Sequence, residues 1–297
     1  MKISRRNILA GAAALGAADL FPFGKAQAQD VPVPDFPPNM PPPKGKAHIL
    51  VISQTKGYEH DSIPNAMAML WNMGHKTGLY DAMLRTDTEL ITKHPTPEQK
   101  RRNMKDLNYF DALVFASTTG ELDLTDQQKT DMMSFIKDDG KGFLGIHAAL
   151  DTLYKWPEYG EMTGGWFDQH PWFTFEAPII NEAPNFPAVR HFPKEFVKRD
   201  EIYQAKDWSR EKVNVLLSLD PRKLNYNNPR VHRTDHDFAV AWAKMHGKGR
   251  VFYSTLGHTR ASWDDPDIQK MYFEAIKFVL WMTEGSTASH PRPELES

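Results

Sequence analysis

The 297-residue sequence contains no cysteine. The chain therefore has no disulfide bond, no thiolate metal site, no iron–sulfur cluster and no cysteine nucleophile. It also lacks the Gly-x-Ser-x-Gly element of α/β serine hydrolases and the phosphate-loop lysine motif of nucleotide-binding proteins. Its Gly-x-Gly-x-x-Gly match, at residues 140–145, leads into a predicted strand, whereas a dinucleotide-binding motif follows a strand and opens a helix. Serine hydrolase and nucleotide-binding functions are thus without support. The 12 histidines and 8 tryptophans are the better candidates for chemistry and recognition.

Strong charge of one sign is also missing. The formal net charge is −2 and no run of more than three basic residues occurs, which argues against nucleic acid as a partner. Hydrophobic residues make up 40% of the chain, as in an ordinary globular protein. The apolar run from Ile8 to Ala18 is too short to cross a bilayer. We therefore expect no membrane span once this N-terminal segment has been removed.

The two ends of the chain differ in composition from its middle. Arg5-Arg6 before the apolar run and Ala26-Gln27-Ala28 after it predict a twin-arginine signal peptide over residues 1–28, and hence a periplasmic or exported protein. Residues 29–46 are rich in proline and are interpreted as a stiff linker; a ligand for an aromatic groove is the less favoured alternative. The polar residues 285–297 are expected to form a loose tail.

Between these ends, residues 47–284 are expected to form a single α/β domain. Strand-like runs at 47–53, 76–80, 110–117 and 143–146 alternate with helical patterns at 62–73 and after the capping boxes that begin at Thr96 and Thr125. This alternation predicts crossover connections and a parallel sheet.

The second half of the domain has a weaker pattern. Strands are expected at 172–180 and 213–219, a hairpin at 238–244 and 250–255, and a final helix at 267–282 that packs back on the sheet. Residues 184–228 are interpreted as mostly loop, apart from the strand at 213–219.

Histidines follow three of the predicted strands at the point where each ends. His60 comes after the first strand, His147 after the strand at 143–146 and His258 after the last strand. Because ligands bind at the carboxyl ends of parallel strands, we expect these side chains to converge. His170, in a loop rich in glycine and aromatic residues, is a fourth candidate. A single histidine of this kind is more often structural than functional, but four of them together favour a site.

The segment around His147 has a distinctive local pattern. Gly145, Ala148 and Ala149 surround the histidine with small residues between a strand and a helix. Such a turn holds its central side chain exposed above the sheet, as the nucleophile elbow of hydrolases does with serine. Imidazole at this position could serve as a base, an acid, a metal ligand or a nucleophile.

Four segments in order resemble the ThuA-like, or trehalose utilisation, family: residues 55–62, 142–149, 156–172 and 249–258. The resemblance covers about residues 47–284. It implies a flavodoxin-like three-layer sandwich with a mostly parallel central sheet, a variant of the class I glutamine amidotransferase fold. In those amidotransferases a cysteine occupies the elbow and a histidine follows a later strand. Here His147 and His258 take these positions, so amidotransferase chemistry is excluded.

The resemblance implies catabolism of a saccharide or a keto-sugar glycoside, with an exported sugar oxidoreductase as a possible partner. An enzyme of this kind needs a base, an acid and an electrophile, and a divalent metal such as zinc could supply the last. The alternatives are a non-catalytic saccharide-binding protein and a partner subunit of the oxidoreductase. Candidate catalytic residues are His60, His147, His170, His258, Glu121 and Asp168; the same four histidines are candidate metal ligands, and the candidate sugar-stacking residues are Tyr58, Trp156, Trp166 and Trp172.

Overall fold

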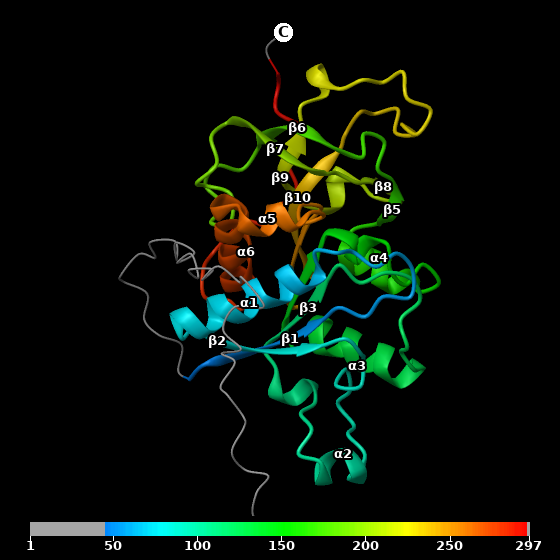
Figure 1. Ribbon diagram of the computed structural model, residues 1–297, viewed down its shortest axis with the longest axis vertical. Coiled ribbons are helices and arrows are strands. Elements are labelled where there is room, and N and C mark those ends of the chain that lie inside the picture. The colour runs from blue at the N-terminus through cyan, green and yellow to red at the C-terminus, as the bar shows by residue number, and fades with distance from the viewer. Residues whose placement is uncertain (1–44, 296–297) are drawn as a thin grey trace, which may run out of the picture. The chain divides into compact units, whose positions relative to one another are not determined.

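The computed structural model describes residues 45–295 (Figure 1). The predicted signal peptide at residues 1–28 and nearly all of the linker at 29–46 lie outside this range, and both stay predictions. Within the described range, no helix is both long and apolar enough to cross a membrane.

A nine-stranded sheet forms the centre of the described chain, with a separate two-stranded sheet, β5 and β8, beside it. The strands are β1 (Ala47–Ile52), β2 (Tyr80–Arg85), β3 (Ala112–Ala116), β4 (Gly142–Ile146), β5 (Trp166–Gln169), β6 (Thr174–Asn181), β7 (Glu195–Glu201), β8 (Gln204–Lys206), β9 (Asn214–Leu219), β10 (Ala239–His246) and β11 (Gly249–Ser254). The order in the large sheet is β2-β1-β3-β4-β11-β10-β9-β6-β7.

The large sheet has a parallel half and an antiparallel half. The five strands β2, β1, β3, β4 and β11 run parallel, which confirms the predicted parallel core. From β11 onward every neighbouring pair is antiparallel, beginning with the predicted β10–β11 hairpin. The carboxyl ends of β1, β4 and β11 therefore lie along one edge of the parallel half, where the sequence places the three histidines.

Helices cover both faces of the sheet. They are α1 (Ile63–Thr77), α2 (Pro97–Arg101), α3 (Asp126–Lys137), α4 (Pro157–Thr163), α5 (Arg260–Asp264) and α6 (Pro266–Val279), with short 3-10 turns η1 (Leu107–Tyr109), η2 (His147–Leu150), η3 (Arg210–Lys212) and η4 (Pro221–Lys223). Helices α1, α5 and α6 contact one another on one face, and α3 and α4 pack on the other (Figure 1). The result is the expected three-layer sandwich.

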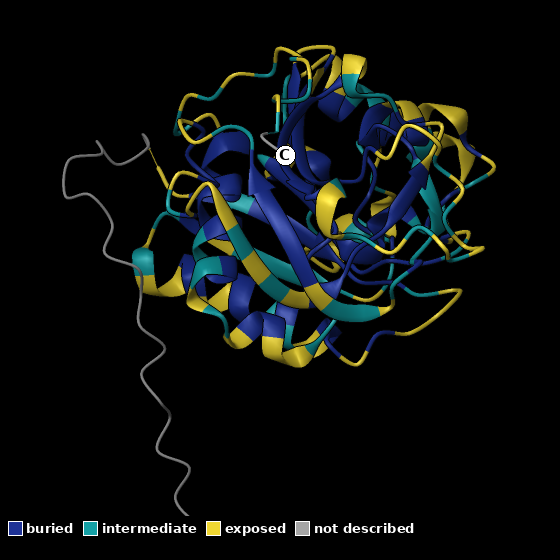
Figure 2. Cartoon of the chain, turned by 90° about the horizontal axis from the view of Figure 1, so that it is seen from above, coloured by how far each residue is buried: buried dark blue, intermediate teal, exposed yellow. Residues whose placement is uncertain are grey.

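Alternation along β1 shows how the two cores form. Ile49 and Val51 are fully buried against α1 and α6, whereas Leu50 and Ile52 are fully buried against the α3 face. Successive side chains of a strand point to opposite faces, so a strand covered on both sides reads as a continuous apolar run. Buried residues are accordingly concentrated in the central strands and exposed ones in the loops and on the outer helix surfaces (Figure 2).

The two predicted capping boxes and the predicted final helix are confirmed. Both capping boxes form: the hydroxyls of Thr96 and Thr125 accept backbone N–H bonds from Gln99 and Gln128, whose side chains bond back to the threonine N–H groups. The final helix packs on β4 and β11 as expected.

Two predicted boundaries are wrong. The strand expected at 76–80 begins only at Tyr80, because α1 continues to Thr77 and ends at Gly78, which has a left-handed φ of 68°. The segment 184–228, interpreted as mostly loop, also contains β7 and β8. Strand β7 lies at the edge of the sheet and alternates half-buried with exposed residues, so it has no apolar run to mark it.

Candidate active site

His147 occupies a sharp turn directly after β4. Its φ is 46°, a left-handed value that is uncommon for a residue other than glycine, and its side chain is completely buried. The small residues predicted around it are needed: a Cβ atom at Gly145 would lie only 2.6 Å from the Tyr253 ring. The Tyr253 hydroxyl donates a hydrogen bond to the backbone carbonyl of His147 and fixes the turn. The predicted elbow turn is therefore present, but its side chain is buried and not exposed as expected, because His60, His258 and Tyr203 pack against the outer side of the ring.

The hydrogen bond on the inner side of the His147 ring fixes its tautomer. Nδ1 lies 2.6 Å from the carbonyl oxygen of Thr255. A carbonyl can only accept, so Nδ1 carries the proton and donates it. Burial, followed by the nearby His60 and His258, holds the pKa of His147 well below its usual value. The imidazole is thus neutral, and its Nε2 lone pair faces outward.

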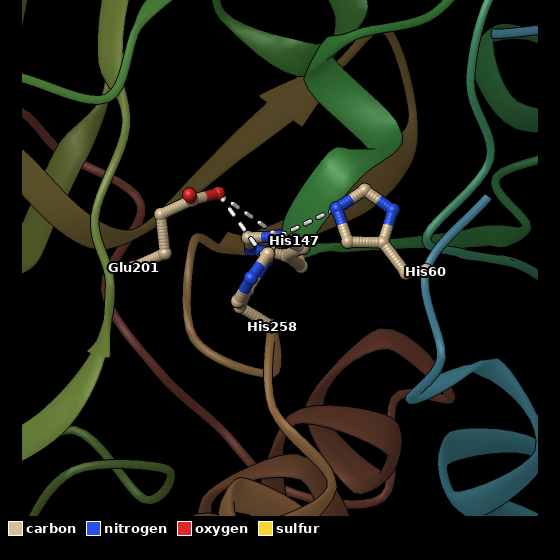
Figure 3. A group of neighbouring side chains, drawn as sticks. All are labelled: His60, His147, Glu201 and His258. Carbon is tan, nitrogen blue, oxygen red and sulfur yellow. Dashed lines mark hydrogen bonds and ion pairs between the residues drawn. The ribbon is translucent and has the colours of Figure 1, made fainter. Parts of the chain in front are cut away.

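Three groups converge on that one lone pair; Figure 3 shows two of them, His60 and His258, beside His147. His60 Nε2 lies 3.2 Å, His258 Nδ1 3.0 Å and the Tyr203 hydroxyl 3.1 Å from His147 Nε2. A single lone pair accepts one good hydrogen bond, so three potential donors exceed its capacity. Moreover, His60 Nδ1 is buried without a hydrogen-bond partner.

Glu201 completes the cluster from the last position of β7. Its Oε2 atom lies 3.3 Å from His258 Nδ1 and 3.7 Å from His147 Nε2, and its Oε1 atom lies 3.5 Å from His170 Nδ1. Burial, together with the charge of Asp200, raises the pKa of Glu201 to about 7. Its contact with the neutral His147 is therefore not an ion pair at neutral pH.

Asp200 positions this part of the site without entering it. Its completely buried carboxylate accepts N–H bonds from Gly257 at 2.7 Å, His258 at 3.0 Å and Glu201 at 2.9 Å. Burial raises the pKa of Asp200 to about 6, although these three bonds favour the ionised form. Asp200 thus holds the backbone of the loop that carries His258, while the next residue, Glu201, projects into the cluster.

Ser62 joins two loops of the site. It precedes α1 but makes no capping bond. Its hydroxyl instead donates a hydrogen bond of 2.9 Å to the carbonyl oxygen of Gly257. The loop after β1 is thereby tied to the loop after β11, which keeps His60 beside His258.

These side chains have the chemistry of a metal site. One ligand atom each from His60, His147, Glu201 and His258 lies within 4.8 Å of the others. Nitrogen ligands of a tetrahedral zinc ion are separated by about 3.3 Å, close to the 3.0 and 3.2 Å found here. Burial also lowers the pKa of His60 to about 4 and that of His258 below its usual value, so both rings are neutral, as ligands must be. Finally, the Nδ1–H bond of His147 to a carbonyl is typical of metal-bound histidine.

The structure therefore brings together three of the four predicted histidines. The fourth, His170, reaches the cluster only through Glu201. His170 contacts Glu201 rather than the other imidazoles, and its ring stacks on Phe167 with centroids 5.7 Å apart. Burial lowers its pKa as well. Its ring packs 5.1 Å from the half-exposed Phe173.

The two predicted carboxylates do not join the cluster. Glu121 is exposed and accepts a 3.1 Å bond from the backbone N–H of Lys155, because the preceding Gly120, with a φ of 75°, turns the chain toward that loop. Asp168 is occupied by the side chains of Gln204 at 2.6 Å and His232 at 2.8 Å.

The predicted aromatic residues divide into two groups. Tyr58 is 66% exposed, and its ring meets that of His60 edge-on at 4.8 Å, so it lies at the mouth of the site. The three tryptophans pack against protein instead: Trp156 on Tyr159, Trp166 on Gly160 and Trp172 on Phe238.

Sequence reasoning missed Glu201 and Tyr203. Glu201 is the last residue of β7 and Tyr203 lies two residues after it, in a segment that the sequence analysis interpreted as a loop. The available signal was the pair Asp200-Glu201 directly before the apolar pair Ile202-Tyr203, which marks carboxylates at the edge of a buried segment.

Residues 48–279 match the family described as trehalose utilisation, ThuA. The chain belongs to this family. A solved ThuA-like protein from Bacteroides uniformis ATCC 8492 is 21% identical, with 82% of this chain and 95% of that chain covered and a TM-score of 0.63. A second, from Parabacteroides merdae ATCC 43184, is 15% identical, with 84% and 98% covered and a TM-score of 0.55. At these identities the two ThuA-like structures support the fold alone. No curated protein matches the chain.

Proposed function

We propose that this ThuA-family protein is a metal-assisted acid–base enzyme that acts on a saccharide, in particular a glycoside carrying a keto group. The observation that carries the proposal is the lone pair of His147 Nε2, which three potential donors approach at 3.0–3.2 Å. A neutral sugar would not require so many imidazoles on one point, whereas a cation binds all of them through lone pairs. The family description, trehalose utilisation, favours a saccharide substrate.

The ion-binding residues in this proposal are His60, His147 and His258; Glu201, the fourth member of the cluster, is assigned to proton transfer. A divalent ion such as zinc would supply Lewis acidity, polarising a substrate carbonyl or hydroxyl. The protein's own contribution is to keep three rings neutral by burial and to fix the His147 tautomer through Thr255.

Glu201 is the proposed acid–base residue. A keto group at C3 of a sugar makes the C2 proton acidic, and an ionised carboxylate can remove it. The electron pair of the C–H bond then forms the C2–C3 double bond, and the carbonyl oxygen becomes an enolate oxygen. Elimination and isomerisation both begin with this removal of the C2 proton. Burial raises the pKa of this carboxyl to about 7 and a bound cation would lower it from there, so the carboxyl is ionised at neutral pH and can accept the C2 proton.

Two neighbours support this chemistry. The Tyr203 hydroxyl lies 3.1 Å from His147 Nε2, and burial raises its pKa well above the usual value, so it stays protonated and can donate a hydrogen bond. His170, 3.5 Å from the other Glu201 oxygen, can accept or return a proton through that carboxylate. On the opposite side of the cluster, the exposed ring of Tyr58 offers an apolar face for stacking on a sugar.

Export by the twin-arginine route remains part of the proposal, supported by Arg5-Arg6 and the short apolar run. That route moves folded proteins, which would allow the metal to be bound before export. An exported sugar oxidoreductase that makes the keto group is the corresponding partner, since the proposed chemistry requires an oxidised substrate.

Two measurements on the same preparation test the proposal. Protein purified without chelator should contain close to one divalent ion per chain by elemental analysis, and it should consume a 3-keto glucoside. The metal-stripped protein should be inactive and recover on addition of zinc or another divalent ion. A loaded protein that binds such glycosides without converting them would instead support a saccharide-binding role, and one that neither binds nor converts them would support a partner subunit.

A further inference from the structure

The edge strand β2 carries a groove far along the sheet from the antiparallel half. The groove has a volume of about 330 Å³. It is lined by His48, Trp71, Asp81, Ala82, Met83, Leu84, Tyr109 and Phe110. We refer to it as the β2 groove. Because β2 is the first strand in the sheet order, one side of its backbone has no neighbouring strand among the described residues.

Aromatic rings on the two sides of β2 remain exposed in this groove. Trp71 is 44% and Tyr109 40% exposed, although large apolar side chains are usually buried. Each ring is held by a neighbour: Trp71 stacks on His75 with centroids 4.8 Å apart, and Tyr109 packs on His48 at 4.1 Å. The groove is thus a preformed surface whose aromatic side chains would need little ordering on binding.

A segment of the same chain has matching chemistry. Residues 31–43 include seven prolines, with Val33, Phe36 and Met40 between them. Proline-rich segments favour the polyproline II conformation, which binds in aromatic-lined grooves at low entropic cost. Proline also lacks the N–H group of a ladder strand, so this segment would cover the β2 edge without prolonging the sheet.

The segment joins the described chain at the groove itself. Lys46 Nζ lies 2.5 Å from the Oδ1 atom of Asp81, one of the lining residues. The backbone N–H of Ala47 then bonds to Leu79 just before β2. In polyproline II, residues 31–43 would extend about 40 Å, so the groove is within reach. A tether this short gives an effective concentration on the order of millimolar.

We propose that residues 31–43 dock in the β2 groove of their own chain. The segment, predicted as a spacer, would then act as an intramolecular cover for an apolar groove and for the unpaired edge of the sheet. Exposed edges of this kind promote association with other chains, and covering them suppresses it.

The absence of cysteine makes disulfide trapping a direct test, since any disulfide must join two introduced residues. In the full chain, Ala82→Cys is combined in turn with Val33→Cys, Phe36→Cys and Met40→Cys, and each pair is treated with a mild oxidant. We expect at least one pair to form an intrachain disulfide at least tenfold faster than its control. In the control, Val197→Cys replaces Ala82→Cys; Val197 is 55% exposed on β7, the opposite edge of the sheet.

A second variant tests whether the prolines matter. Replacing all seven with serine keeps the length of the segment, and we expect trapping of the best pair to slow at least fivefold. Trapping no faster than the Val197 control at all three positions would overturn the proposal, as would trapping that is unchanged in the serine variant. A product of dimer size would assign the groove to a second copy of the chain and would also refute intrachain docking.

Discussion

The Nδ1 atom of His147 lies 2.6 Å from the carbonyl oxygen of Thr255. Thr255 directly follows β11, and the same short loop carries His258 three residues later. The bond therefore joins two parts of the site: it fixes the tautomer of the elbow histidine and keeps the His258 loop against it. The acceptor is a backbone carbonyl at the end of β11 and the donor ring follows β4, so the accuracy of the site depends on how β4 and β11 pair in the sheet.

Loss of one imidazole should weaken metal binding. We expect His258→Ala to lower zinc affinity by more than about 100-fold, because a direct ligand is removed and partners behind the ligands already contribute 10–100-fold. His232→Ala is the matched control, since His232 pairs with Asp168 outside the cluster. Competition with a chromophoric chelator measures both affinities. Equal affinities in the two variants would contradict the metal site.

Asp200 should affect the site although it does not touch the proposed ion. In Asp200→Asn, one oxygen is replaced by an NH₂ group that cannot accept the N–H of Gly257 or His258. An unpaired buried donor costs about 1–3 kcal/mol, which urea denaturation would measure as a lower free energy of unfolding. Zinc affinity should fall as well, by about 10–100-fold, because His258 loses its support. A stable variant with unchanged zinc affinity would show that the loop holds His258 without Asp200.

The histidine site could be predicted from the sequence because each histidine directly follows a recognisable strand. His60, His147 and His258 each follow a strand of the parallel half, and crossover connections place the ends of such strands at one edge. The elbow at His147 was also readable, since only small residues fit around it. These predictions needed only the positions of the strands, which the apolar runs mark, and their common direction, which follows from the alternation of strands and helices.

Glu201 could not be found in this way. It ends β7, which is four strands away from β11 in the sheet order, yet Asp200 beside it bonds to Gly257 and His258. The return of β7 to the β11 loop depends on the twist accumulated over the antiparallel half, a property of the assembled sheet. Glu121 was selected instead because it follows the strand at 110–117, and Asp168 because it lies close to His170 in sequence, but they bond to Lys155 and to Gln204 and His232.

The proposed export would depend on a part of the chain outside residues 45–295. Changing Arg5 and Arg6 together to lysine should leave the precursor in the cytoplasm, because a twin-arginine signal requires the arginine pair. Fractionation followed by immunoblotting measures the distribution. Lys25→Arg, in the same segment but outside the pair, is the control. Normal amounts of processed protein in the periplasm of the double variant would refute the route.

Glu201 provides the most specific test of the chemistry. Glu201→Gln keeps the shape of the side chain and the three imidazoles but removes the base, so activity on a 3-keto glucoside should fall by about 10²–10⁴-fold while bound metal is retained. In the unchanged protein the carboxyl must be ionised to accept the C2 proton. Burial raises the pKa of Glu201 to about 7 and a bound divalent ion would lower it from there, so kcat/KM should rise about tenfold per pH unit below the Glu201 pKa and level off no higher than pH 7. Glu176→Gln, an exposed β6 residue paired with Arg199, should leave both activity and profile unchanged. Full activity in Glu201→Gln would assign proton removal to another group, of which His170, 3.5 Å from the same carboxylate and outside the three proposed ligands, is the first candidate.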